Sequence, residues 1–386
     1  MPVSRLAWLL LLSLANLPVW AEPAKAPLPA NTPQPAKAVA PAPAPAQKTI
    51  RPEPALAGPT WEGSQFVRAD RKGKIFLFRG DGFQVYPQAA GGTLGEPAQL
   101  ESTAERAAMV LDAVLSPAGD QWLVNADSGA RLFVSGKEKA LPPLYWRPWS
   151  VGFLRNTPVV AVVPIPVGGF NLDLENLSEV PWLYSLGNGQ WESLVEQRGL
   201  TGKDVAQARR EQKDVVADSA IFLIADHSGK LWVGRQYAYR VERWSPSGRP
   251  LDEIVVDGGK VEEKKYREEN GSKMPKDYHR FTAKAAIRDL VEGTDHRMYF
   301  LVTRPDGALV LDRYDPTLAV LERVPLDVTK KSSRFTLASG KDGLYLAAWN
   351  GRDGRWRIPW EILEEADWQK VEEAEIHGGS NSKSAG

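Results

Sequence analysis

The clearest alternation of apolar and turn-forming positions lies in residues 221–256. Four short β-prone runs stand there, Ile221–Ala225, Lys230–Arg235, Tyr239–Trp244 and Leu251–Val256. The turns between them include Asp226-His227-Ser228-Gly229 and Ser245-Pro246-Ser247-Gly248. Because Gly tolerates positive φ, Pro fixes φ, and Asp or Ser can bond back to the backbone, both segments predict tight turns. A four-stranded meander of this length has the size of one propeller blade.

The same unit recurs along the chain. Its second strand is marked by an aromatic or β-branched residue, at Phe76, Trp122, Val160, Trp232, Tyr299 and Tyr345. A second aromatic falls on the expected third strand, at Tyr86, Phe133, Tyr184, Trp244, Tyr314 and Trp356. Such repetition is typical of propellers. We therefore predict an all-β, six-bladed β-propeller of four-stranded antiparallel blades, with five or seven blades as alternatives because the third unit is poorly defined.

Polar insertions lengthen the repeat at three places, near Pro164–Ser178, Gln197–Lys213 and Gly258–Thr282. The second could form a short exposed helix. The third carries charges of both signs, which indicates a solvated flexible loop. The alternative is a docking element that becomes ordered on a partner.

The central unit also resembles a known repeat. Asp226, Gly229, Leu231, Trp232 and Val233 match its first two strands, and the segments 240–244 and 246–248 match its third strand and following turn. The unit is similar to NHL-type blades and to the wider six-bladed propeller superfamily. It departs from them at Gly234-Arg235-Gln236, where an Asp is usual. The resemblance supports the fold and carries no function, because this fold hosts binding modules, lactonases and scaffolds.

Residues outside the repeat predict the domain organisation. Residues 1–21 read as a secretory signal peptide, with Arg5, an apolar run over 6–17 and a small residue at Ala21. The alternative is an uncleaved anchor. Residues 22–57 form a Pro/Ala-rich linker that cannot bury a core. We place the propeller at 58–365, expect a strand from 60–68 to close the ring, and expect a polar, disordered tail at 366–386.

The charge balance and the absence of cysteine limit which partners and sites the chain can have. The chain has 48 basic and 48 acidic residues, which gives no reason to expect nucleic acid or an anionic membrane as a partner. It has no cysteine, which excludes a lipid-modified Cys, a thiolate metal site and a Cys nucleophile. We expect a periplasmic or secreted protein of the bacterial type, without a stable transmembrane segment after signal cleavage.

Catalytic signatures are missing. The four histidines, His227, His279, His296 and His377, have neither H-x-x-x-H nor H-x-H spacing, so we predict no metal ligands and no catalytic residues. Similar propellers of the lactonase type hold a divalent metal in the central channel, and that resemblance implies Asp112, Asp218, Asp226 and Asp289 as candidates. We interpret Asp226 as a turn residue and the other three as solvated strand ends.

Aromatic residues supply the candidate binding site. Of the 14 tryptophans, Trp122, Trp232 and Trp244 fit blade-packing positions. Two loops combine aromatics with Arg, a pattern of binding hot spots and sugar platforms. Their residues are Tyr145, Trp146, Arg147 and Trp149 in one and Arg235, Tyr237 and Tyr239 in the other. The alternative for both loops is packing between blades.

We therefore expect an exported, non-catalytic propeller that binds a protein or cell-envelope partner and has no cofactor. One alternative is a metal-dependent, lactonase-like hydrolase with a divalent ion in the central channel. The other is a glycan-binding propeller that uses exposed tryptophans.

Overall fold

The computed structural model describes most of the chain after residue 47. The described residues are 48–61, 63–102, 110–126, 129–166, 182–194, 221–235, 239–247, 249–256, 261–265, 279–283, 286–304, 306–328, 334–350 and 354–378. The predicted signal peptide, most of the predicted linker and the predicted helix in 197–213 lie outside them.

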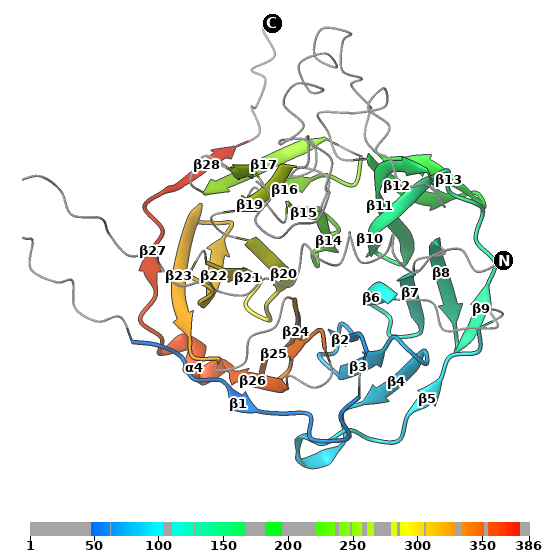
Figure 1. Cartoon of the computed structure of the whole chain (residues 1–386), viewed down its shortest axis with the longest axis horizontal. Coiled ribbons are helices and arrows are strands. Elements are labelled where there is room, and N and C mark those ends of the chain that lie inside the picture. Colours follow the sequence, from blue (N-terminus) through cyan, green and yellow to red (C-terminus); the bar gives the residue numbers. More distant parts are fainter. Residues whose placement is uncertain are drawn as a thin grey trace, which may run out of the picture. The chain divides into compact units, whose positions relative to one another are not determined.

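Six antiparallel sheets form the blades of a six-bladed propeller, which confirms the predicted fold (Figure 1). Blades 1 to 3 consist of β2 (Gln65–Ala69), β3 (Ile75–Arg79), β4 (Gln84–Pro87) and β5 (Ala98–Gln99), then β6 (Val110–Leu115), β7 (Gln121–Ala126), β8 (Gly129–Val134) and β9 (Lys137–Lys139), then β10 (Trp146–Leu154), β11 (Thr157–Pro166), β12 (Trp182–Gly187) and β13 (Gln190–Ser193). Blades 4 to 6 begin with β14 (Ile221–Ala225), β15 (Leu231–Arg235), β16 (Arg240–Trp244) and β17 (Pro250–Val256), continue with β20 (Ala286–Glu292), β21 (Met298–Thr303), β22 (Leu309–Asp315) and β23 (Val320–Leu326), and end with β24 (Phe335–Gly340), β25 (Gly343–Ala348) and β26 (Arg355–Pro359).

The repeat markers fall where the sequence predicts them. The second-strand markers lie on β3, β7, β11, β15, β21 and β25, and the third-strand aromatics lie on β4, β8, β12, β16, β22 and β26. The third unit is a true blade, in which Val160 of β11 pairs with Tyr184 of β12. Trp122, Trp232 and Trp244 are buried, as expected for packing residues.

Ring closure differs from our expectation. Residues 65–69 form β2, the innermost strand of blade 1, and do not pair as the outer strand of the last blade. The outer strand of blade 6 is instead β1 (Glu53–Pro54), which pairs with β26 and lies in the segment that we expected to be linker. Ile50, also in that segment, is buried against blades 5 and 6. The propeller therefore begins several residues before position 58.

The expected disordered tail is also wrong over its first half. β27 (Gln369–Lys370) pairs with β23, and β28 (Ala374–Gly378) pairs with β17. Blades 4 and 5 consequently have five strands each, where we predicted four. Val371 between the two added strands is buried in the core that blades 4 and 5 share.

Helical structure is limited to short elements in the described part of the chain. These are the 3-10 helix η1 (Ala90–Gly92) and the α-helix α4 (Trp360–Glu364). Neither could span a bilayer: no helix within the described residues combines the length and apolar character that a membrane crossing requires.

The two faces of the ring differ in what they carry. Because strands alternate in direction within each blade, the turns from first to second and from third to fourth strand share one face, here called the turn face, which includes His227 and Leu318. The other connections open on the opposite face, here called the insertion face, which includes Tyr145. All three insertions leave and rejoin the blades at the insertion face, between β11 and β12, between β13 and β14, and between β17 and β20. The last contains a hairpin, β18 (Val261–Lys265) with β19 (His279–Ala283), where we expected a flexible loop.

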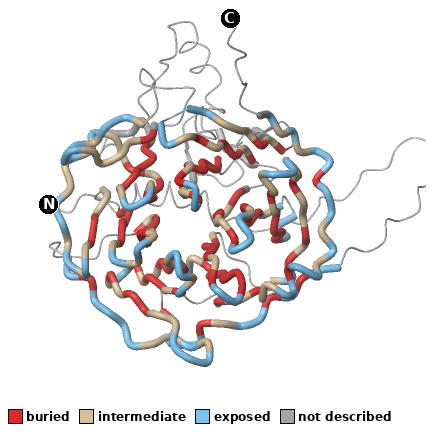
Figure 2. The backbone as a smooth tube through the Cα atoms, turned by 180° about the vertical axis from the view of Figure 1, so that it is seen from behind, coloured by how far each residue is buried: buried red, intermediate tan, exposed pale blue. Residues whose placement is uncertain are grey.

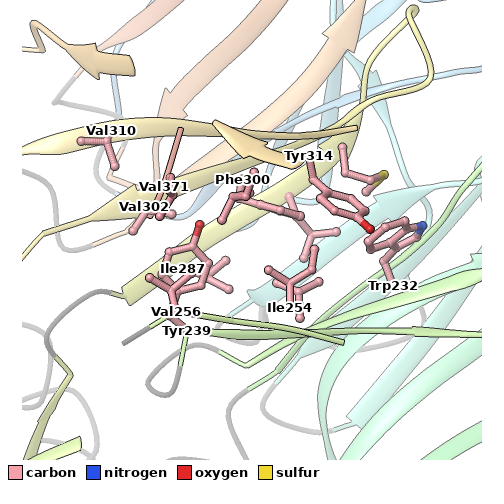
Figure 3. Packing of buried hydrophobic residues seen from close by; sticks show 14 residues of the cluster. Trp232, Tyr239, Ile254, Val256, Ile287, Phe300, Val302, Val310, Tyr314 and Val371 are labelled. Carbon is pink, nitrogen blue, oxygen red and sulfur yellow. The ribbon is translucent and has the colours of Figure 1, made fainter. Parts of the chain in front are cut away.

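The apolar core lies between neighbouring blades. Figure 2 shows buried residues along the inner strands and exposed stretches along the outer rim. One large cluster joins blades 4 and 5, where the ring of Trp232 meets that of Tyr314 edge-on at 5.9 Å between centroids (Figure 3). Second strands are covered on both faces, which explains why all five residues of β15 and all six of β25 are buried.

Candidate functional site

The central channel is occupied by an arginine. Arg68 lies on β2, and its guanidinium donates to Asp289 of β20 at 2.9 Å through Nη1 and to Asp112 of β6 at 3.1 Å through Nη2. Its Nε also donates to the carbonyl of Ala113 at 2.7 Å. Two of the aspartates that the lactonase resemblance implies therefore converge in the channel, and both bind the same cation.

The two aspartates are structural in a second way. Each lies at a register shift of its strand and accepts a hydrogen bond from the amide of the next residue, Ala113 or Leu290, at 2.9 Å. Asp112 also accepts from the amide of Val151 in blade 3, at 3.3 Å, and Asp289 from that of Leu337 in blade 6, at 2.8 Å. Each carboxylate thus satisfies one backbone amide on the innermost strand of the following blade.

Our interpretation of Asp112 and Asp289 as solvated strand ends is wrong, because both are buried. Burial raises the pKa of the Asp289 carboxyl above its ordinary value, Arg68 opposes this shift, and Asp112 reinforces it. Arg68 therefore offsets the repulsion between two carboxylates that share a buried site.

Asp226 performs the turn chemistry that we expected. Its carboxylate accepts from the amide of Lys230 at 2.9 Å, the hydroxyl of Ser228 at 2.7 Å and the indole Nε1 of Trp232 at 3.0 Å. Asp218, the fourth candidate, lies outside the described residues.

The first predicted aromatic loop lies at the insertion face, where blade 2 connects to blade 3. Tyr145 is 69% exposed, the highest value among the large hydrophobic side chains that the structure describes. Its ring meets that of Trp146 edge-on, with 4.6 Å between centroids. Trp146 is half-buried against the core between these blades, and Arg147 and Trp149 are also half-buried. Trp149 occupies a bulge in β10, and its carbonyl accepts from the side-chain amide of Asn125 at 2.9 Å.

The second predicted loop is different. Arg235 and Tyr239 at its ends are only 3% and 2% exposed, so neither side chain is on the exposed platform that we expected. Arg235 forms an ion pair with Glu242 at 3.2 Å. The hydroxyl of Tyr239 donates to Asp312 of blade 5. Burial and this carboxylate hold the pKa of the Tyr239 phenol well above its ordinary value. Tyr237 lies outside the described residues.

The described residues also form a cleft that the sequence did not reveal. It lies at the turn face between blades 4 and 5, has a volume of about 640 Å³, and is lined by residues that include His227, Glu292 and His296. His227 lies in the β14–β15 turn, Glu292 ends β20, and His296 lies in the β20–β21 turn. Within the described part of the chain, these three form the one group of His, Cys, Asp and Glu residues whose ligand atoms all lie within 4.8 Å of one another.

Contacts within this group are close. The ring Nδ1 of His227 contacts Glu292 Oε1, and Nδ1 of His296 lies 3.5 Å from the same oxygen. The two imidazole rings are 4.0 Å apart between centroids and tilted by 33°. The backbone amide of His227 donates to Glu292 Oε2 at 2.6 Å, which fixes the orientation of the carboxylate. The sequence did contain a signal, since both histidines occupy first-to-second-strand turns of consecutive blades.

Comparisons with known proteins do not assign this chain to a family. No protein-family model matches the sequence, and no curated protein matches it. Similar solved structures include the extracellular domain of a proposed one-component system from B. thetaiotaomicron, with 13% identity and a TM-score of 0.39. The match covers 81% of this chain but only 35% of that domain. A catalytically inactive virginiamycin B lyase from Staphylococcus aureus with quinupristin has 12% identity and a TM-score of 0.43 over 84% of this chain and 98% of the other. The Swd1 β-propeller domain from Myceliophteria thermophila has 12% identity and a TM-score of 0.43 over 79% and 99%.

Proposed function

We propose that this chain is an exported, non-catalytic β-propeller that binds a protein or cell-envelope partner through its insertion face. The observation that carries the proposal is the placement of the additions to the repeat. All three insertions, and the connection that presents Tyr145, open on the same face of the ring. Binding residues are commonly held on loops that a rigid scaffold positions, and an additional loop on one face enlarges the surface available there.

The chemistry of Tyr145 and Trp146 supports this surface. An aromatic ring that is 69% exposed costs little conformational entropy to immobilise and offers a large apolar contact area. Trp146 contacts the ring of Tyr145 and packs against the core between blades 2 and 3, so it anchors Tyr145 to the blades. An anchored aromatic pair of this kind is typical of the energetic centre of a protein interface.

The channel network favours a scaffold over the hydrolase alternative. A channel metal would need the carboxylates of Asp112 and Asp289, and the guanidinium of Arg68 binds both of them. The same contacts hold the inner strands of blades 1, 2, 5 and 6 in a fixed arrangement. A rigid ring with its additions on one face is suited to presenting a surface.

Site-specific crosslinking in the native host tests the proposal. A photo-crosslinking phenylalanine replaces Tyr145 at the insertion face, and the matched control replaces Leu318, which is 68% exposed at the turn face. We expect one discrete adduct from position 145 that Trp146→Ala weakens, and none of that mass from position 318. Equal adducts from both positions, or an adduct from position 318 alone, would overturn the proposal.

A further inference from the structure

The two histidines of the turn-face cleft come from equivalent turns in neighbouring blades. In blade 4 the turn runs from Asp226 to Lys230, and within it the amide of Gly229 donates to the carbonyl of Asp226 at 2.9 Å. In blade 5 the turn runs from Gly293 to Arg297, and the amide of His296 donates to the carbonyl of Gly293 at 3.0 Å. His296 therefore occupies the turn position that Gly229 holds in the preceding blade.

That position requires a left-handed backbone. Its φ is 79° at Gly229, and the corresponding glycines of blades 1 and 2, Gly73 and Gly119, have φ of 69° and 82°. His296 adopts φ of 63° at the same place. A residue with a Cβ pays a conformational cost in this region that glycine does not. Strained backbone of this kind is concentrated at functional sites, and here it places an imidazole opposite His227.

The ligand set matches a zinc-class divalent ion. Such ions bind His nitrogen and carboxylate oxygen at ~2.0–2.2 Å, which in a tetrahedral site puts ligand atoms ~3.3 Å apart. The Nδ1 of His296 and Oε1 of Glu292 are already 3.5 Å apart. The second carboxylate oxygen is held by the amide of His227, an outer-shell contact that orients a ligand before the metal binds.

The surroundings of the cluster also favour a cation. The residues that line the cleft include four carboxylates and three basic side chains. Asp226, Asp295 and Asp315 each accept an amide of their own turn, whereas Glu292 accepts the amide of His227 from the neighbouring blade through Oε2. Glu292 is the remaining carboxylate, and it points at the two imidazoles.

We propose that His227, Glu292 and His296 bind one zinc-class divalent ion at the turn face between blades 4 and 5. Three protein ligands leave the fourth position of a tetrahedral ion open toward the cleft, where water or a small anionic group completes the coordination. This site is distinct from the central channel and from the insertion face, so it does not depend on the binding function proposed above.

Zinc titration of the tag-free full chain by isothermal calorimetry tests the site, with cobalt absorption as a second readout. His296→Gly removes one ligand and installs the residue that other blades carry at this position, so it preserves the fold. His377→Gln is the matched control, because His377 is 58% exposed and lies 3.5 Å from Glu375 without a second imidazole.

We expect one zinc per chain, an affinity ~100-fold or more weaker in His296→Gly, and unchanged binding in His377→Gln. Cobalt should give the intense visible bands of a four-coordinate site in the wild type and lose them in His296→Gly. The proposal would be overturned if the wild type bound no zinc, if His296→Gly bound it equally well, or if His377→Gln lost it.

Discussion

The guanidinium of Arg68 in blade 1 donates to the carboxylate of Asp289 in blade 5 at 2.9 Å, although blade 6 lies between these blades in the ring. On its other side it donates to Asp112 of blade 2. Removal of either partner would leave a buried charge without compensation, which is the costly case for a buried ion pair. The centre of this propeller therefore depends on one side chain.

Arg68→Met should lower the free energy of unfolding by about 3–5 kcal/mol, because Asp112 and Asp289 would remain buried and uncompensated. The matched control is Arg304→Met, which removes a surface ion pair. In that pair, Arg304 Nε lies 3.9 Å from Asp306 Oδ2, and both side chains are about half exposed. The control should change stability by about 1 kcal/mol or less. Urea unfolding measures both. A loss of the same size in the two variants would show that the channel network has no special role.

The pH dependence of stability should differ between two aspartates. Burial raises the folded-state pKa of Asp289 above its ordinary value of 3.8, so its ionised form costs stability at neutral pH. That cost should disappear as the pH falls through the raised pKa toward 3.8. Relative to Asp289→Asn, the wild type should therefore gain stability on acidification.

For Asp315 we expect the opposite change in stability on acidification. Burial alone would raise its pKa, but the amides of Leu318 and Thr317 and the guanidinium of Arg297 outweigh burial and lower it. Relative to Asp315→Asn, the wild type should lose stability as the pH falls through the ordinary value toward the lowered one. Urea unfolding between neutral pH and pH ~3.5 tests both differences. The assignment fails if the two variants shift in the same direction.

Truncation after Asp367 should destabilise the ring although it removes a polar segment. It deletes β27, β28, the buried Val371 and Trp368. The indole of Trp368 donates to the carbonyl of Leu363 at 2.7 Å, and the guanidinium of Arg313 stacks over its ring. Loss of the buried Val371 and of the partly buried Trp368, Ala374 and Ile376 should cost about 3–5 kcal/mol. Truncation after Gly378 is the control and should leave the unfolding midpoint unchanged. Equal midpoints for the two truncations would mean that the added strands do not contribute to stability.

His296→Gly should raise the stability of the metal-free protein by about 1 kcal/mol or less, because it removes a Cβ from a left-handed position while adding unfolded-state entropy. His227→Gly is the comparison, since His227 has no left-handed backbone to relieve. That change should lower stability by about 0.5–1 kcal/mol. Thermal unfolding with a chelator present distinguishes the two, and a loss in His296→Gly would remove the argument from strain.

Packing determined which parts of the fold could be predicted. Most aromatics of the second and third strands are buried, so their pattern is visible in the sequence. Two of the strands that we missed, β1 and β27, have only two residues each, all exposed. They pair through backbone groups, which every residue has, so no side-chain pattern marks them.

The candidate sites were harder to predict because their partners are remote in sequence. Arg235 and Tyr239 resembled an exposed binding loop, but Glu242 and Asp312 satisfy them inside the protein. His227 and His296 have no local metal spacing, and only the alignment of consecutive blades places them face to face. The exposure of Tyr145 could be predicted from the sequence because its loop breaks the blade pattern.

Anomalous diffraction from zinc-soaked crystals would test most directly where the chemistry of this propeller lies. We predict one strong peak at the turn face between His227 and His296, with Asp112 and Asp289 still bound to Arg68. A peak in the central channel between Asp112 and Asp289, with Arg68 displaced, would contradict it and would restore the channel hydrolase as the leading interpretation.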